Sequence, residues 1–242
     1  MTLHISDTVD ELLTQLAEYF IDSATESIER KGRFSVALSG GSSPELLYGL
    51  LSSPDFCERV DWTKVFFFLG DERYVSLTNP ASNFKMIKAV LFVPLGIDAS
   101  QVFPVDTSLS PAAAAADYLQ KIQQHFDGSL PCFDLILLGL GDNAHTASLF
   151  PFTDILHESG ASVRAVFLPD QLLYRISFTA PLINMAHRVA FLVYGASKAY
   201  AVKNVLDGVE DILHYPAQMI HPVDGALDWF LDTAAAAKIR KY

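Results

Sequence analysis

The run at residues 133–138 and the glycines that follow it constrain the fold more than any other part of the sequence. The run is almost entirely apolar, and only Asp134 interrupts it. A short continuous apolar run is typical of a strand that is covered on both faces, as in a parallel sheet. Gly139 and Gly141 then allow the backbone to turn sharply and to lie close to a ligand, and His145 follows them. The sequence therefore predicts a buried strand that ends in a ligand-binding loop.

Other short apolar runs alternate with segments of helical spacing. The further predicted strands are residues 34–38, 65–69, 163–168, 175–179 and 189–194. The predicted helices are residues 9–28, a segment from Pro44, a segment after Ser82, residues 111–126 and a segment from Ser197 to Leu206. This alternation predicts an α/β fold in one domain over residues 1–242, with a doubly wound, mainly parallel, Rossmann-like sheet and helices on both faces.

The ends of these elements are less defined by the sequence. Ser6 or Asp7 is expected to cap the first helix, and Gly32 is expected to end it. The tail is ambiguous, because the alternation at residues 227–232 favours a strand whereas the alanines after it favour a helix.

Composition excludes several classes of protein. The chain has 17 basic and 28 acidic residues and a net charge of −11, which argues against sequence-independent binding of nucleic acid. The two cysteines, Cys57 and Cys132, lack the spacing of a zinc site or a disulfide framework. The N-terminus does not resemble a signal peptide, and no apolar run approaches the ~20 residues of a membrane helix. We therefore expect a cytoplasmic protein.

Two predicted loops carry groups suited to anions. Gly40, Gly41 and Ser42 lie between a strand and a helix, where backbone N–H groups and the helix dipole favour a phosphate. An ordinary strand-to-helix turn is an equal alternative for this loop. Asp71 and Arg73 follow the strand at 65–69. Arg73 is a candidate anion ligand, although a solvated turn is the commoner fate of such charges.

Three further residues complete the candidate site. His145 is a candidate proton-transfer group near neutral pH, while a metal site is disfavoured because no second ligand lies at suitable spacing. Ser148 does not lie in the G-x-S-x-G sequence of a serine nucleophile. Arg175 begins a predicted strand and Lys198 begins a predicted helix, where a lysine favours an anionic neighbour. A surface lysine paired with a carboxylate is the alternative.

These loops occur together in an order that resembles the 6-phosphogluconolactonase family, within the larger group that includes glucosamine-6-phosphate deaminase. The resemblance covers nearly the whole chain. It rests on LSGGSSPELLYGLL at 38–51, DERYV from 71, ASNFKMI up to 87, FDLILLGLGDNAHTASLFP at 133–151, RISFTAPLIN at 175–184, FLVYGASKA at 191–199, PAQMIHP and the spaced Gly225, Trp229 and Asp232. Arg73, the Ser82–Asn83 pair and HTASLFP favour the lactonase branch over the deaminases.

The chain departs from the family pattern at two places. The family loop usually reads Asp-Gly-His, whereas this chain has Asn143, Ala144 and His145. The neighbouring Asp142 is a candidate to replace part of the lost charge. Ser76 stands where a proline often follows the DERxV motif.

The resemblance implies hydrolysis of 6-phospho-D-glucono-1,5-lactone to 6-phosphogluconate, in the oxidative pentose phosphate pathway, without a metal or organic cofactor. It implies that His145 is the general base, that Asn143 orients the water or the imidazole, and that the substrate is bound by Gly40, Gly41, Ser42, Asp71, Arg73, Arg175 and Lys198. The expected partner is a phosphorylated sugar lactone, and the expected state is a monomer or a homodimer. The alternatives are a glucosamine-6-phosphate deaminase or isomerase and a non-catalytic sugar-phosphate sensor.

Overall fold

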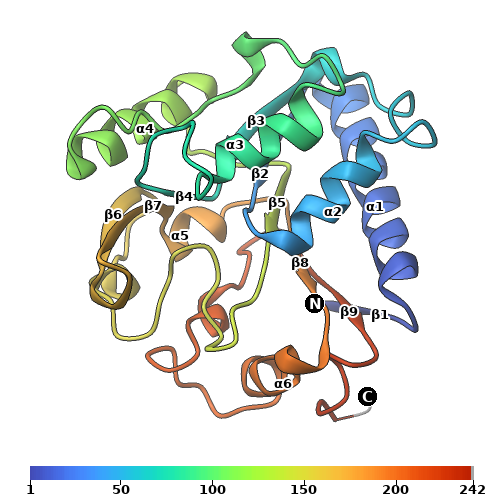
Figure 1. The fold of residues 1–242 in the computed structure, drawn as a ribbon, viewed down its shortest axis with the longest axis vertical. Coiled ribbons are helices and arrows are strands. Elements are labelled where there is room, and N and C mark those ends of the chain that lie inside the picture. Colours follow the sequence, from blue (N-terminus) through green and yellow to red (C-terminus); the bar gives the residue numbers. More distant parts are fainter. Residues whose placement is uncertain (241–242) are drawn as a thin grey trace.

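A six-stranded sheet forms the centre of the protein, whose computed structural model describes residues 1–240 (Figure 1). Every neighbouring pair of strands in this sheet is parallel. The strand order is β1 (Thr2–Ser6), β9 (Ala226–Asp232), β8 (Arg188–Val193), β5 (Leu135–Leu138), β2 (Phe34–Leu38) and β3 (Val65–Leu69). The expected α/β class with a mainly parallel sheet is therefore confirmed, whereas the expected single domain stays a prediction.

Helices cover both faces of this sheet and enclose two apolar cores. On one face lie α1 (Val9–Lys31), α2 (Ser42–Leu51) and α3 (Asn83–Ile87), and on the other lie α4 (Pro111–His125), α5 (Ala180–Ile183) and α6 (Ala199–Leu206). Leu135 and Leu137 of β5 belong to the first core, and Ile136 and Leu138 belong to the second. Because successive side chains of a strand point to opposite faces, a strand buried on both faces needs the continuous apolar run seen at 135–138.

Short helical turns complete the connections. They are η1 (Trp62–Lys64), η2 (Lys88–Phe92), η3 (Ala99–Gln101), η4 (Asp154–His157), η5 (Pro169–Gln171), η6 (Ala196–Lys198) and η7 (Pro216–Met219).

Two of the predicted strands lie outside the parallel sheet. β6 (Val163–Leu168) and β7 (Leu173–Phe178) form a separate antiparallel sheet with β4 (Asp71–Arg73), in the order β4-β7-β6. The connection between β6 and β7 consists of η5 and Leu172, which has a left-handed conformation with φ of 48°. A connection this short joins only antiparallel strands, because a parallel crossover needs about a dozen residues.

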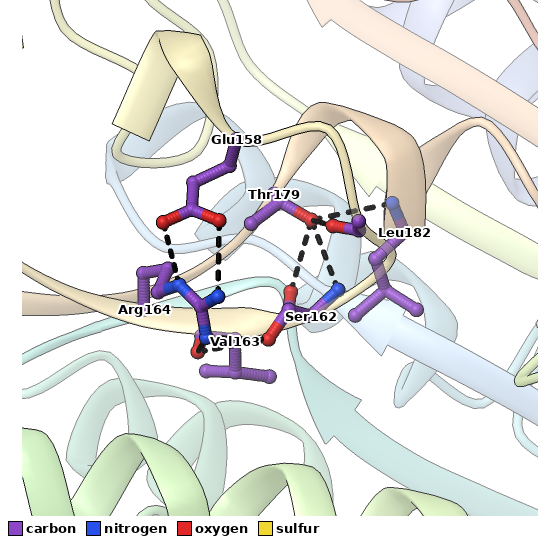
Figure 2. A network of polar contacts seen from close by, with 7 residues as sticks. Glu158, Ser162, Val163, Arg164, Thr179 and Leu182 are labelled. Atoms are coloured by element: carbon purple, nitrogen blue, oxygen red, sulfur yellow. Dashed lines mark hydrogen bonds and ion pairs between the residues drawn. The ribbon is translucent and has the colours of Figure 1, made fainter. Parts of the chain in front are cut away.

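A polar network ties the small sheet to α5, as Figure 2 shows. The hydroxyl of Thr179, the N-cap of α5, donates to the carbonyl of Gly160 at 2.9 Å. It accepts from the amides of Ser162 at 3.0 Å and Leu182 at 3.4 Å. Beside it, Arg164 donates from Nε and Nη2 to the two oxygens of Glu158. These contacts lie at the end of β7, the strand that carries Arg175.

The chain ends differ from the sequence-based expectation. β1 was not predicted, and it ends at Ser6, one of the two residues expected to cap the first helix. The N-cap of α1 is therefore Thr8 and not Ser6 or Asp7, and Thr8 forms a capping box with Glu11. Gly32 ends α1 as predicted, with φ of 78°. The ambiguous tail is strand β9, which buries the side chains on both of its faces.

The strand order places a ligand crevice beside β2. The chain passes from β2 to β3 on one side, whereas β5 lies on the other side of β2. In open α/β sheets, ligands bind at the carboxyl ends of the strands at such a switch point. Residues 39–44 after β2 and residues 139–145 after β5 both start at this edge.

Candidate active site

A cavity of about 370 Å³ lies at the carboxyl ends of β2, β5 and β8, beside the small antiparallel sheet. Its lining includes every predicted site residue except Asn143, namely Gly40, Gly41, Ser42, Asp71, Arg73, His145, Arg175 and Lys198. The loops after β2, β5 and β8 therefore meet the strands β4 and β7 at one cavity. Asn143 lies outside the lining but contacts His145 directly.

Three neighbours fix the imidazole of His145. Asn143 Oδ1 lies 2.5 Å from His145 Nδ1. The ring stacks on Phe150, with ring centroids 3.9 Å apart and an angle of 18° between the planes. Gly141 lies under the ring, where an added Cβ would be only 2.0 Å from His145 Nδ1. The glycine in this loop is therefore required by the close approach of the imidazole.

The contact with Asn143 sets the proton on the imidazole. Asn143 Oδ1 also accepts from the backbone N–H of His145 at 3.3 Å, and an N–H group only donates. The oxygen of the amide therefore faces His145, and Nδ1 must carry a proton to donate to it. Nε2 is then the unprotonated nitrogen, which leaves its lone pair for a ligand in the cavity.

The surroundings keep the imidazole neutral. The pKa of His145 is lowered to about 4, chiefly by burial; Lys198 and Arg175 contribute to the lowering, whereas Asp71 and Asp142 oppose it. Above this pKa the ring is uncharged and can accept a proton. Asn143 adds no negative charge to oppose the shift, because an amide is neutral.

Arg73 and Arg175 stand directly opposite each other in the β4–β7 pair. Like charges at such positions repel, and the Nε of each guanidinium is buried without a hydrogen-bond partner. Arg175 is only 8% exposed, and burial lowers its pKa. Arg73 donates to the carbonyl of Ala81 at 2.8 Å, and Arg175 donates to the side chain of Gln171. Each cation keeps unused donors, so the pair is suited to an anion.

The acidic residues beside Arg73 have two different tasks. Asp71 lines the cavity and accepts from the hydroxyl of Ser148 at 2.6 Å. Ser148 is fully buried, which agrees with its rejection as a nucleophile. Glu72 does not line the cavity. Its carboxylate accepts hydrogen bonds from the backbone amides of Asn83 and Phe84, both at 2.8 Å, at the start of α3. Burial raises the pKa of Glu72, and these hydrogen bonds oppose that shift.

Asn83 explains why Gly40 has no side chain. An added Cβ at Gly40 would lie 1.9 Å from Asn83 Oδ1. Asn83 Nδ2 donates to the carbonyl of Asp71 at 2.9 Å. The DER and Ser-Asn motifs therefore meet, and they support the loop at 39–44 from behind.

Lys198 reaches the cavity from the loop after β8. Its Nζ lies 2.7 Å from Asp142 Oδ1. This pairing with a carboxylate of the chain is the alternative that the sequence left open for Lys198, although Lys198 also lines the cavity. Asp142 therefore does not bind the imidazole of His145 as a replacement for a carboxylate at 143, although its charge still acts on that ring.

The sequence did not single out several residues of the site. Phe150 and Asn83 lie within the motifs that carry the family resemblance, so their positions were marked but their contacts were not. Gln171 also lines the cavity. It lies in the turn between β6 and β7, and no local pattern marks it.

Two negative findings concern residues 1–240. No helix in this range has the length and apolar character needed to cross a membrane. Within the same range, no three His, Cys, Asp or Glu side chains are grouped so that they could hold a metal ion.

Comparison with known proteins agrees with this geometry. A 6-phosphogluconolactonase of Nostoc sp. is 39% identical over 250 aligned positions, which cover 98% of this chain and 95% of the relative. The solved 6-phosphogluconolactonase of Trypanosoma brucei superposes with a TM-score of 0.85 at 27% identity, over 99% of this chain and 98% of that one. A monomeric glucosamine-6-phosphate deaminase shares the fold, with a TM-score of 0.82 at 22% identity over 98% and 99% of the two chains. Residues 7–229 match the family described as glucosamine-6-phosphate isomerases/6-phosphogluconolactonase. The chain therefore belongs to this family.

Proposed function

We infer that the protein hydrolyses 6-phospho-D-glucono-1,5-lactone to 6-phosphogluconate, the second step of the oxidative pentose phosphate pathway. The full-length similarity to 6-phosphogluconolactonases supports this activity. The structural observation that carries it is a neutral His145 with a free Nε2 in a cavity that also holds two opposed arginines. A lactone is an activated ester, so the reaction needs a water activator, an oxyanion ligand and a phosphate ligand.

We propose that Arg73 and Arg175 bind the phosphate. Both side chains have a buried Nε that lacks a partner, and two oxygens of a phosphate can accept the two parallel N–H···O bonds that a guanidinium donates. The phosphate would also remove the repulsion between the two cations. Backbone and hydroxyl groups of Gly40, Gly41 and Ser42 are proposed to hold the remaining substrate oxygens, and Asp71 is proposed to accept from a sugar hydroxyl.

His145 is proposed to act as the general base. Nε2 takes a proton from a water while the water oxygen attacks C1 of the lactone. The tetrahedral intermediate then collapses, the bond between C1 and the ring oxygen breaks, and the ring oxygen takes the proton back from Nε2. The product acid releases its own proton to solvent. Asn143 is proposed to hold the Nδ1–H tautomer throughout these steps.

Lys198 is proposed to stabilise the oxyanion at C1. Its partner Asp142 precedes His145 by three residues, so the ammonium group lies beside the His145 loop. Lys198 also lowers the pKa of His145 more strongly than Arg175 does. An ammonium group beside the base can oppose the negative charge that develops on the attacked carbonyl.

We further propose that the protein acts in the cytoplasm as a monomer or a homodimer. The substrate is a phosphorylated sugar, and such charged metabolites do not cross membranes unaided. This supports an enzyme located where the lactone is made.

The test is a coupled assay with freshly generated lactone, with the spontaneous hydrolysis subtracted as a blank. We expect lactone hydrolysis well above the blank and no ammonia release from glucosamine 6-phosphate. Ammonia release would instead assign the protein to the deaminases. Tight binding of 6-phosphogluconate without turnover would make it a sensor.

A further inference from the structure

Two tyrosines with fully buried side chains bind the backbone where two strands reach the cavity. The hydroxyl of Tyr48 in α2 accepts from the N–H of Ser39 at 3.1 Å and donates to the carbonyl of the same residue at 2.8 Å. The hydroxyl of Tyr118 in α4 accepts from the N–H of Leu69 at 2.7 Å and donates to its carbonyl at 3.2 Å. Because α2 and α4 lie on opposite faces of the sheet, the same arrangement occurs once on each side.

Both backbone residues lie where strand pairing ends. Leu38 is the last residue of β2 and pairs with Leu69, so Ser39 lies just beyond the paired residues. β3 is the last strand of the six-stranded sheet, so Leu69 has no neighbouring strand of that sheet on its outer side. Buried N–H and C=O groups without partners are costly, and a single hydroxyl can satisfy one of each.

The two phenols are suited to this task at any physiological pH. Burial is the main cause that raises the pKa of Tyr48 and of Tyr118 well above the ordinary value. Each hydroxyl therefore keeps the proton with which it donates to a carbonyl.

The residues after these contacts belong to the candidate site. Ser39 leads into the loop at 39–44, whose residue Gly41 is the N-cap of α2 and has no side chain with which to cap that helix. Tyr48 reaches back nine residues from the same helix to the start of the loop. Leu69 leads directly into residues 70–73, which include the cavity residues Asp71 and Arg73.

We propose that Tyr48 and Tyr118 are positioning residues whose hydroxyls place the loop at 39–44 and the segment at 70–73 for binding of the ligand. This inference rests on the proposed lactonase function. Neither tyrosine lines the cavity, so both act through the backbone and not on the substrate. Without its hydroxyl, each tyrosine would leave two buried backbone groups unpaired, and the segment would have to shift to find other partners.

The base should be affected much less than the binding of the ligand. His145 is held by Asn143 and Phe150, and neither tyrosine takes part in these contacts. A weaker grip on the ligand with an intact base raises KM and leaves kcat nearly unchanged.

The experiment compares Tyr48→Phe and Tyr118→Phe with Tyr19→Phe. All three changes remove one hydroxyl and keep the ring, so we expect the variants to fold. Tyr19 is the matched control, because its hydroxyl donates to Asp228 at 2.8 Å and its side chain does not line the cavity. The measurements are calorimetric binding of 6-phosphogluconate, steady-state lactone hydrolysis, thermal unfolding and amide hydrogen exchange by NMR.

The dissociation constant of 6-phosphogluconate and KM for the lactone should each rise about tenfold for Tyr48→Phe and for Tyr118→Phe, as for one lost hydrogen bond to a charged ligand. Amide exchange should become faster at residues 40–42 in Tyr48→Phe and at residues 70–73 in Tyr118→Phe. Tyr19→Phe should unfold at a lower temperature than wild type but bind 6-phosphogluconate like wild type.

Unchanged affinity in both cavity-side variants, or a loss of affinity no larger than that of Tyr19→Phe, would overturn the proposal. A fall in kcat at unchanged KM would overturn it as well, because the effect would then lie on the base. The amides of Ser39 and Leu69 should exchange slowly in wild type, and fast exchange there would contradict the two contacts without any substitution. A wild-type protein that does not hydrolyse the lactone would refute the proposed function, whereas the exchange rates would still decide whether the tyrosines hold their segments.

Discussion

Gly141→Ala is the substitution whose effect the site geometry defines most sharply. The added Cβ would lie 2.0 Å from Nδ1 and 2.1 Å from Cε1 of His145. Nonbonded heavy atoms need more than 3 Å, so the imidazole must move by about 1 Å. That movement breaks the contact with Asn143 and the stacking on Phe150. Because a misplacement of about 1 Å can reduce the rate about 100-fold, we expect kcat to fall by about two orders of magnitude.

Gly49→Ala is the control for this prediction. It adds the same methyl group within α2 and outside the cavity lining, where no atom lies within 4 Å of the added Cβ. Steady-state lactone hydrolysis should give near wild-type kcat for Gly49→Ala and a large loss for Gly141→Ala. Both variants should unfold near the wild-type temperature, since the imidazole can swing into the cavity. Full activity of Gly141→Ala, or equal losses in both variants, would refute the proposed placement of the base.

Three further predictions follow from the contacts in the structure. Arg175→Met should raise KM for the phosphorylated lactone about tenfold or more, as for the loss of hydrogen bonds to a charged group. The turnover of glucono-1,5-lactone, which has no phosphate, should change little. Equal losses on both substrates would oppose a phosphate-binding role. Asn143→Asp should raise the pKa of His145, because a carboxylate at Nδ1 stabilises the imidazolium. Since kcat/KM is lost as the pH falls through this pKa, the acid limb of the pH profile of kcat/KM should move to higher pH. An acid limb that does not move would exclude His145 as the titrating base. Asp228→Ala should lower the free energy of unfolding by at least about 1.5 kcal/mol in urea titrations. The reason is that the buried Asp228 accepts a hydrogen bond from Tyr19 at 2.8 Å and pairs with His4 of β1 at 2.9 Å. An unchanged free energy of unfolding would show that this network does not hold β1 to the sheet.

The local sequence predicted those elements whose burial or capping requires a recognisable pattern of residues. β5 was predicted because both of its faces are covered, which requires an apolar side chain at every position from Leu135 to Leu138. The cap of α4 was predicted because Ser110 and Pro111 suit the first positions of a helix.

Elements that depend on distant partners were missed or misplaced. β1 is an edge strand, and Thr2 and Ile5 are exposed, so no apolar pattern marks it; pairing with β9 makes it a strand. The patterns of β6 and β7 predicted strands correctly but did not identify their neighbours. Those neighbours are set by the short turn at 169–172 and by β4, which is about 90 residues away in sequence from β6.

The candidate site shows the same division. Gly40, Arg73 and His145 lie in loops with marked local sequence, and all three line the cavity. The contacts that fix them come from elsewhere in the fold. Asn83 lies against Gly40, Arg175 faces Arg73 through strand register, and Asp142 holds Lys198. Such pairings arise only when separate loops meet in space, so a single sequence marks the residues but not their partners.

The role of His145 is tested most directly by the turnover of His145→Ala. The assay is blank-corrected lactone hydrolysis at neutral pH, alongside circular dichroism and binding of 6-phosphogluconate to show that the variant is folded and still forms the phosphate site. Because a positioned general base contributes about 10²–10⁴-fold, we predict that kcat falls by that factor while the variant keeps its fold and its ligand. A folded His145→Ala protein that hydrolyses the lactone at the wild-type rate would contradict the account.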